Sequence, residues 1–175
     1  MTAQDCTTET LDDGRRRLTF ERRLNHPIER VWAALTEPHE LEAWLARAEV
    51  DLTTGGRISL EWLNTDEDGN RYENAAATGT ITRLDPPHLL EFDNDVHGLL
   101  RWELRDAGGA TDLTFTSILA LPDDVAARTQ AGWHTHLDFL EEWLADGTRI
   151  DWPNWPRERW AAHNERYEAS MRPIS

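Results

Sequence analysis

Most of the chain alternates between apolar and polar residues, which is the pattern expected of strands with one buried face. Gly and Pro residues interrupt this alternation, and short polar segments join most of the runs to the next. Connections this short favour antiparallel pairing of neighbouring strands. The pattern predicts strands at residues 16–25, 48–52, 57–62, 75–84, 89–92, 100–104 and 111–121.

Apolar residues recur at helical spacing in the remaining segments. A short helix is expected to begin at Pro27, and a second one to cover residues 38–45. A long helix is predicted at residues 125–146 and a last helix at residues 157–169. Gly132 lies inside the long helix at a cost of about 1 kcal/mol relative to Ala. We therefore expect it to allow a close approach between this helix and a sheet.

The long helix must bury its apolar face, and a curved antiparallel sheet is the surface available to cover it. The predicted fold class is therefore α+β, with a curved antiparallel sheet wrapped around a long C-terminal helix and two short helices after the first strand. We expect a flexible polar leader at residues 1–14, one domain at residues 15–147, and a Trp-rich extension with a short helix at residues 148–175. A sheet wrapped around one helix often leaves a cavity between the two.

The charge of the chain narrows its range of partners. The 175 residues carry a formal net charge of −15, and all 18 basic residues are Arg. Nucleic acids and anionic membrane surfaces require a basic face, so we expect neither as a partner. Without Lys, the chain has no Schiff-base or phosphate-loop lysine. The acidic N-terminus lacks a signal-peptide pattern, and no run of about 20 apolar residues occurs, so we predict a cytoplasmic protein.

Motifs for catalysis, cofactors and metals are missing from the sequence. No G-x-S-x-G elbow, dinucleotide fingerprint or phosphate loop occurs, so we predict no cofactor and assign no catalytic residue. His134 and His136 are two residues apart on the long helix and point to different sides, so we predict no metal site there. Cys6 is the single cysteine, and we expect a disordered thiol. The acidic strand residues expected to face solvent are Glu61, Glu91 and Glu103.

Several local motifs follow the order found in a known family. The matching segments are 27–36 (PIERVWAALT), 36–44 (TEPHELEAW), 55–57 (GGR), 79–81 (GTI), 86–92 (PPHLLEF) and 132–144 (GWHTHLDFLEEWL). Together they resemble, over residues 16–147, the family named after the activator of heat-shock protein 90 ATPase, in the START-like (SRPBCC) superfamily. The resemblance implies the helix-grip fold and a cavity that binds apolar molecules. A few superfamily members are cyclases, hydrolases or self-resistance proteins. The Trp-rich extension departs from the minimal domain, so the resemblance implies nothing for it.

The cavity wall is expected on the inner face of the sheet and the facing side of the long helix. Large aromatic residues with a polar edge often line ligand pockets. The alternative is that these side chains simply fill the core, and that His136 is a hydrogen-bonded core histidine rather than a polar anchor. The candidate lining residues are Leu60, Trp62, Leu90, Phe92, Trp102, Phe115, Trp133, His136, Leu137 and Leu140.

Three functions are compatible with these features. We predict a cytoplasmic binding protein for a small, largely apolar ligand held between sheet and long helix, and we favour a role without catalysis. A cyclase- or hydrolase-type enzyme is the second, and it needs a polar pair inside the cavity from among Tyr72, Asn94, His97 and His136. A co-chaperone-like interaction module is the third. The apolar surface of the extension should dock beside the long helix, over the cavity mouth, across a homodimer or on a protein partner.

Overall fold

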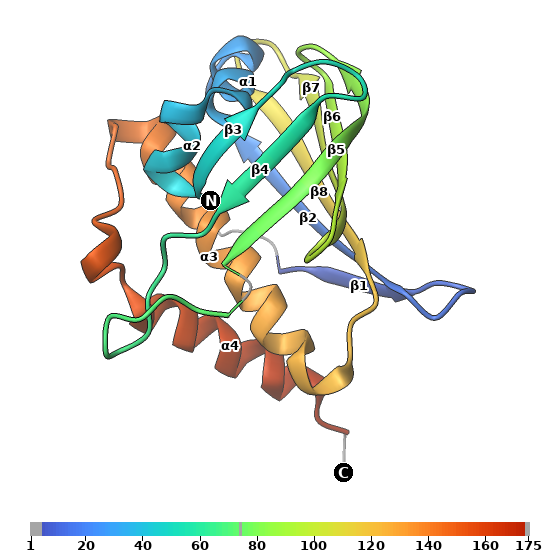
Figure 1. Cartoon of the computed structure of the whole chain (residues 1–175), viewed down its shortest axis with the longest axis vertical. Coiled ribbons are helices and arrows are strands. Elements are labelled where there is room, and N and C mark those ends of the chain that lie inside the picture. Colours follow the sequence, from blue (N-terminus) through green and yellow to red (C-terminus); the bar gives the residue numbers. More distant parts are fainter. Residues whose placement is uncertain (1–4, 74, 174–175) are drawn as a thin grey trace.

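One antiparallel sheet and four α-helices form the computed structural model of the protein, which describes residues 5–73 and 75–173 (Figure 1). The eight strands lie in the order β1-β2-β8-β7-β6-β5-β4-β3. They are β1 (Thr7–Thr10), β2 (Arg16–Leu24), β3 (Arg47–Val50), β4 (Arg57–Glu61), β5 (Ala76–Asp85), β6 (Leu89–Asn94), β7 (Gly98–Asp106) and β8 (Thr111–Leu119). The helices are α1 (Ile28–Thr36), α2 (Pro38–Trp44), α3 (Asp123–Asp146) and α4 (Arg157–Met171), with a 3-10 turn η1 (Trp152–Asn154) before α4. None of these described helices has the length and apolar character needed to span a bilayer.

The sheet curves around α3, and α1 and α2 lie at the end of the sheet drawn at the top of Figure 1. Trp133, Leu137 and Leu140 of α3 belong to the same buried cluster as the inward-facing residues of the strands. Every neighbouring strand pair is antiparallel. The predicted α+β helix-grip fold is therefore confirmed.

Aromatic side chains from three adjacent strands form the centre of the inner face. Phe115 of β8 lies opposite Phe20 of β2 and Trp102 of β7 in the strand register. The Phe115 ring centroid is 6.0 Å from that of Phe20 and 4.1 Å from that of Trp102, and both pairs are stacked. The ring of Trp133 lies 4.6 Å from that of Phe115. The contact between Trp133 and Phe115 therefore places α3 against the aromatic centre of the sheet.

The extension that follows α3 folds back onto its own domain. Trp152 donates its Nε1–H to the carbonyl oxygen of Glu42 at 2.8 Å. Trp155 is only 5% exposed and donates its Nε1–H to the carbonyl oxygen of Thr65 at 2.8 Å. Helix α4 then packs against α3, as Figure 1 shows at the bottom of the view. Docking beside the long helix was one of the arrangements that the sequence predicted.

The N-terminal residues differ from the flexible leader that their sequence predicts. Residues 7–10 form β1, which pairs antiparallel with β2. Cys6 is partly buried, its backbone N–H donates to the Tyr167 hydroxyl at 3.0 Å, and burial raises the pKa of its thiol. All four residues of β1 are exposed, so no alternation of apolar residues marks this strand in the sequence.

Glu91 also departs from its expected environment. The sequence places it on the outer face of the sheet, where solvent was expected, but its side chain is buried. Arg101 Nε and Thr82 Oγ1 donate to its carboxylate at 2.7 and 2.9 Å. Burial raises the pKa of the Glu91 carboxyl, but these hydrogen bonds outweigh it, and the net pKa is lowered. The carboxylate therefore has a structural role within the sheet.

The predicted role of Gly132 is wrong. A Cβ atom at this position meets no heavy atom within 4 Å, so the helix makes no close approach there. Gly79 of β5 is the contrasting case, because a Cβ there lies 2.2 Å from the carbonyl oxygen of Asp93. The tight contact that requires glycine lies within the sheet, and Gly132 faces open space instead.

Gly132→Ala should stabilise the protein, because alanine favours a helix by about 1 kcal/mol over glycine and its methyl group enters open space. Urea unfolding is expected to give a free energy of unfolding about 0.5–1 kcal/mol above that of the wild type. Gly79→Ala is the matched control and should lose stability, because its methyl group collides with β6. A Gly132→Ala variant that unfolds at lower urea than the wild type contradicts this description of the site.

Trp155→Ala should lower the free energy of unfolding by about 3–5 kcal/mol, because it empties a buried site and removes one donor to the Thr65 carbonyl. Trp155→Phe keeps most of the apolar contact and should cost clearly less. Urea and thermal unfolding measure both variants. If Trp155→Ala matches the wild type in both measurements, the extension does not brace the domain.

Candidate functional site

A pocket of about 530 Å³ lies where one end of the sheet meets α3 and the extension. Five segments line it: the connection after β4, the turn between β6 and β7, the loop from β8 into α3, one face of α3, and the extension. Because antiparallel strands alternate in direction, the C-terminal ends of β4, β6 and β8 meet at the same end of the sheet. The topology therefore gathers these loops around the start of α3.

Three aromatic rings form one wall of the pocket. Trp62 follows β4, His97 lies in the turn after β6, and Trp133 projects from α3. The ring centroids of Trp62 and His97 are 4.6 Å apart, and Trp133 lies edge-on to both at 6.1 and 5.7 Å. Trp133 also contacts Phe115 of the core at 4.6 Å. Its side chain therefore separates the filled core from the pocket.

Helix α3 forms a shallow and mostly apolar floor. The stripe that faces the pocket at helical spacing consists of Val125, Thr129, Gly132 and His136. Gly132 leaves open space in the middle of this stripe. The hydroxyl groups of Thr129 and Thr135 donate to carbonyl oxygens of their own helix at 3.1 and 2.7 Å. These hydroxyl protons are therefore already engaged and do not point to a polar ligand.

Two histidines of the lining are uncharged at neutral pH. Burial lowers the pKa of both His97 and His136 to about 4. Nδ1 of His136 lies 3.0 Å from the carbonyl oxygen of Trp44. Because a carbonyl only accepts, Nδ1 carries the proton and Nε2 keeps its lone pair. His136 is thus a hydrogen-bonded core histidine that also borders the pocket, and its role as a ligand anchor stays a prediction.

The extension supplies Trp155 and Trp160 to the pocket lining. The guanidinium of Arg157 lies 5.5 Å from the Trp155 ring centroid, and its Nη2 donates to Thr65 Oγ1 at 2.7 Å. Together with the Trp155 indole hydrogen bond to Thr65, these contacts hold the ring in place. The extension is therefore both a brace for the domain and a wall of the pocket.

The ten predicted lining residues separate into two groups. Three of them border the pocket: Trp62, Trp133 and His136. The other seven lie in the core, are at most 4% exposed and do not line this pocket: Leu60, Leu90, Phe92, Trp102, Phe115, Leu137 and Leu140. The sheet closes tightly enough on α3 for facing side chains to fill the space between them. This hollow lies beyond Trp133, where the strands end and α3 carries a glycine.

Several lining residues escape prediction from the sequence. Among them, only the stripe on α3 has a recognisable pattern in the sequence, because its residues recur at helical spacing around Gly132. The loop residues of the lining follow no periodic pattern. Tyr72 and His97 border the pocket, whereas Asn94, also considered for a polar pair, does not. Asn94 Oδ1 instead accepts the backbone N–H of His97 at 2.7 Å and stabilises the turn.

The pocket lacks a paired acid and base. Among the described residues of its lining, no hydrogen bond or ion pair joins two ionisable side chains. Side chains that could hold a metal gather in two other places: His134, Asp138 and His163 between α3 and α4, and Glu37, His39 and Glu40 near the start of α2. None of these six residues borders the pocket. The described part of the lining therefore offers no acid and base in contact for proton transfer.

Solved structures share the fold along almost the whole chain. CalU16 from Micromonospora echinospora is 22% identical, with a TM-score of 0.69, and the match covers 97% of this chain and 98% of that one. The protein encoded by gene BPP1335 of Bordetella parapertussis is 27% identical, with a TM-score of 0.67 and coverage of 100% and 97%. DynU16, from the dynemicin biosynthetic locus, is 23% identical, with a TM-score of 0.60 and coverage of 78% and 50%. No curated protein matches the chain.

The family resemblance rests on more than local motifs. The family model described as activator of Hsp90 ATPase homolog 1-like protein matches residues 25–145, which is more than half of the chain. The matched region runs from the end of β2 to the end of α3 and leaves the extension outside. The chain therefore belongs to the family of activator of Hsp90 ATPase homolog 1-like proteins.

Proposed function

We propose that the protein is a cytoplasmic binding protein for a small, largely apolar ligand, held in the pocket beside α3. The observation that carries this proposal is the hollow of about 530 Å³ between Trp133, the strand ends and the extension. Pockets for small molecules typically measure about 300–1,000 Å³. The hollow thus has the size of a ligand site rather than of a packing defect.

The character of the lining supports an apolar ligand. Four tryptophans contribute to it: Trp62, Trp133, Trp155 and Trp160. The indole N–H of Trp155, the hydroxyl of Thr135 and Nδ1 of His136 are already engaged in hydrogen bonds with backbone carbonyl groups. Burial keeps His97 neutral. A ligand in this pocket therefore meets mainly carbon, and the polar side chains of Asn64, Glu73 and Arg128 stand at its border.

The two alternative functions have weaker support. An enzyme of the cyclase or hydrolase type needs an acid and a base in contact, and the described lining holds no such pair. A co-chaperone-like module needs an exposed apolar patch. The large exposed apolar side chains among the described residues are Leu52, Tyr72 and Met171, from three separate segments. We therefore favour ligand binding over the other two functions.

Gly132→Leu tests the proposal, because Gly132 lines the pocket and a Cβ atom there meets no heavy atom within 4 Å, so that the added side chain should occupy space that a ligand needs. We expect the wild type to bind a neutral apolar dye such as Nile red, with quenching of tryptophan fluorescence. The variant should bind at least about tenfold more weakly, a loss of about 1.4 kcal/mol. Its thermal midpoint should equal or exceed that of the wild type, because leucine is a better helix former than glycine.

Ala145→Leu is the matched control, because it adds the same side chain at an exposed position of α3 outside the pocket lining. This variant should bind the dye like the wild type. Two results oppose the proposal: a wild type that binds none of a panel of neutral apolar dyes, or a folded Gly132→Leu variant whose affinity is unchanged.

A further inference from the structure

Polar side chains make up a large part of the contact between α3 and α4. Tyr167 is the one buried residue of the described part of α4. Side chains of α4 instead make paired polar contacts with α3, namely Arg159 with Glu142, His163 with Asp138, and Tyr167 with His134. Tyr167 and Trp160 of α4 also pack against Ala127 and Ala131 of α3. The polar pairs lie beside this small apolar cluster, and one group of them has the composition of a metal site.

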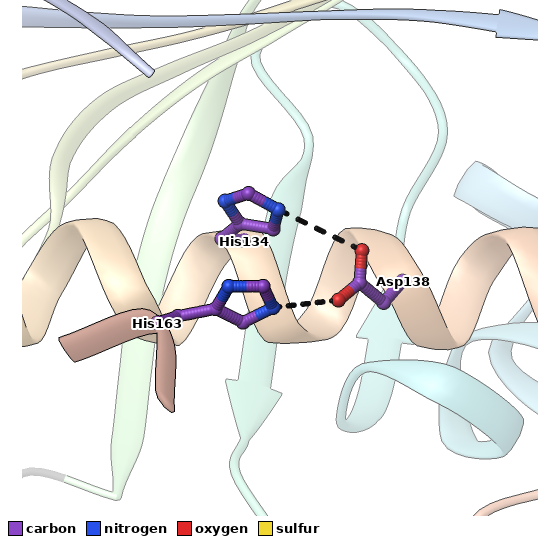
Figure 2. Close-up of side chains that lie close together, drawn as sticks. All are labelled: His134, Asp138 and His163. Carbon is purple, nitrogen blue, oxygen red and sulfur yellow. Dashed lines mark hydrogen bonds and ion pairs between the residues drawn. The ribbon is translucent and has the colours of Figure 1, made fainter. Parts of the chain in front are cut away.

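Three of these side chains converge on one point between the helices (Figure 2). His134 and Asp138 are four residues apart on α3, so they share one face of that helix. His163 reaches the same carboxylate from α4, with its Nε2 at 2.8 Å from Asp138 Oδ2. Nε2 of His134 lies 3.8 Å from Asp138 Oδ1. The three ligand atoms all lie within 4.8 Å of one another.

These separations match the needs of a small coordinated cation. A tetrahedral ion with bonds of about 2.0–2.1 Å to nitrogen and oxygen holds its donor atoms roughly 3.3 Å apart. The distances from Asp138 Oδ2 to His163 Nε2, 2.8 Å, and from Asp138 Oδ1 to His134 Nε2, 3.8 Å, lie on either side of that value. The two imidazole rings are stacked at 3.8 Å between centroids with 22° between their planes. Metal binding requires the two rings to rotate about their side-chain bonds until the Nε2 lone pairs of both point toward the same ion.

The hydrogen bond of the second ring nitrogen of His134 is of the kind found in metal-binding histidines. Its Nδ1 lies 2.8 Å from the Tyr167 hydroxyl, which also accepts the backbone N–H of Cys6 at 3.0 Å. With Nδ1–H donating to this oxygen, Nε2 of His134 keeps its lone pair toward Asp138. Metal-bound histidines usually donate their second N–H to such an oxygen, which fixes the tautomer and the ring orientation.

We propose that His134, Asp138 and His163 bind a first-row divalent metal ion, with Zn²⁺ as the natural candidate. Two imidazole nitrogens and one carboxylate form a donor set of the kind that Zn²⁺ uses with three protein ligands and a water molecule. The side chains of Asp138 and His163 are 22% and 14% exposed, which leaves a route for the ion and its water. His136 is not part of the site, because its ring is hydrogen-bonded to Trp44.

The bound ion links α4 to α3 directly. Trp160, one turn before His163 on α4, lines the pocket. The metal therefore also fixes the position of this pocket wall. The inference does not depend on the proposed ligand, because it concerns side chains outside the pocket lining and is tested with the metal alone.

Zinc titration of the untagged, EDTA-stripped full-length protein tests the site. Calorimetry should give one Zn²⁺ per chain, and the thermal midpoint should rise with Zn²⁺ and return to its starting value with EDTA. His163→Gln and Asp138→Asn keep polar side chains of similar size and should each weaken binding at least about tenfold. His39→Gln is the control, because His39 belongs to the exposed cluster near α2, and it should bind Zn²⁺ like the wild type.

A spectroscopic measurement on the wild type keeps the test valid even if a variant fails to fold. X-ray absorption of the zinc-loaded protein should show two imidazole ligands with oxygen donors completing the shell. The proposal is overturned if the wild type binds no Zn²⁺, if His39→Gln alone abolishes binding, or if folded His163→Gln and Asp138→Asn variants bind as tightly as the wild type. A zinc shell without two imidazoles overturns it as well.

Discussion

The packing of Trp133 against the aromatic residues of the sheet is the contact on which both core and pocket depend. On one side the indole meets Phe115 at 4.6 Å and Trp102 at 6.4 Å. On the other side it lies edge-on to Trp62 and His97. Close packing ends at this ring, because α3 presents Gly132 and Thr129 to the pocket in the turn before it. One side chain thus seals the core and bounds the hollow.

The extension lies outside the region that the family model matches, and it packs beside the pocket that Trp133 borders. Its first part is held by indole hydrogen bonds to backbone carbonyl groups of α2 and of the segment after β4. Its helix then lies on α3 through polar contacts. Trp155 and Trp160 complete the pocket. The stability of the extension and the shape of the proposed ligand site are therefore physically linked.

The sequence predicts the fold well and the site poorly, for a physical reason. Alternation and helical spacing record which face of each element is buried, so β2 to β8, α3 and α4 lie close to where these patterns place them, whereas the fully exposed β1 has no such pattern. Burial alone does not distinguish a core residue from a pocket residue, and Trp102 and Trp133 look alike in the sequence although only Trp133 borders the pocket. Contacts distant in sequence, such as Cys6 with Tyr167 or His134 with His163, leave no local pattern at all. Gly132 is unusual inside a helix, but glycine lowers helix stability by the same amount whether it allows a close approach to the sheet or opens a pocket.

The proposed apolar ligand binds beyond Trp133 and leaves the core unchanged. Fluorine NMR of the protein labelled with 5-fluorotryptophan tests it most directly, because the tryptophans lie on both sides of this boundary. During titration with 1-naphthol, the resonances of Trp62, Trp133, Trp155 and Trp160 should shift, whereas those of Trp44 and Trp102 should stay nearly constant. Saturable shifts confined to Trp44 and Trp102, or no saturable shift at any tryptophan of the pocket, contradict the account.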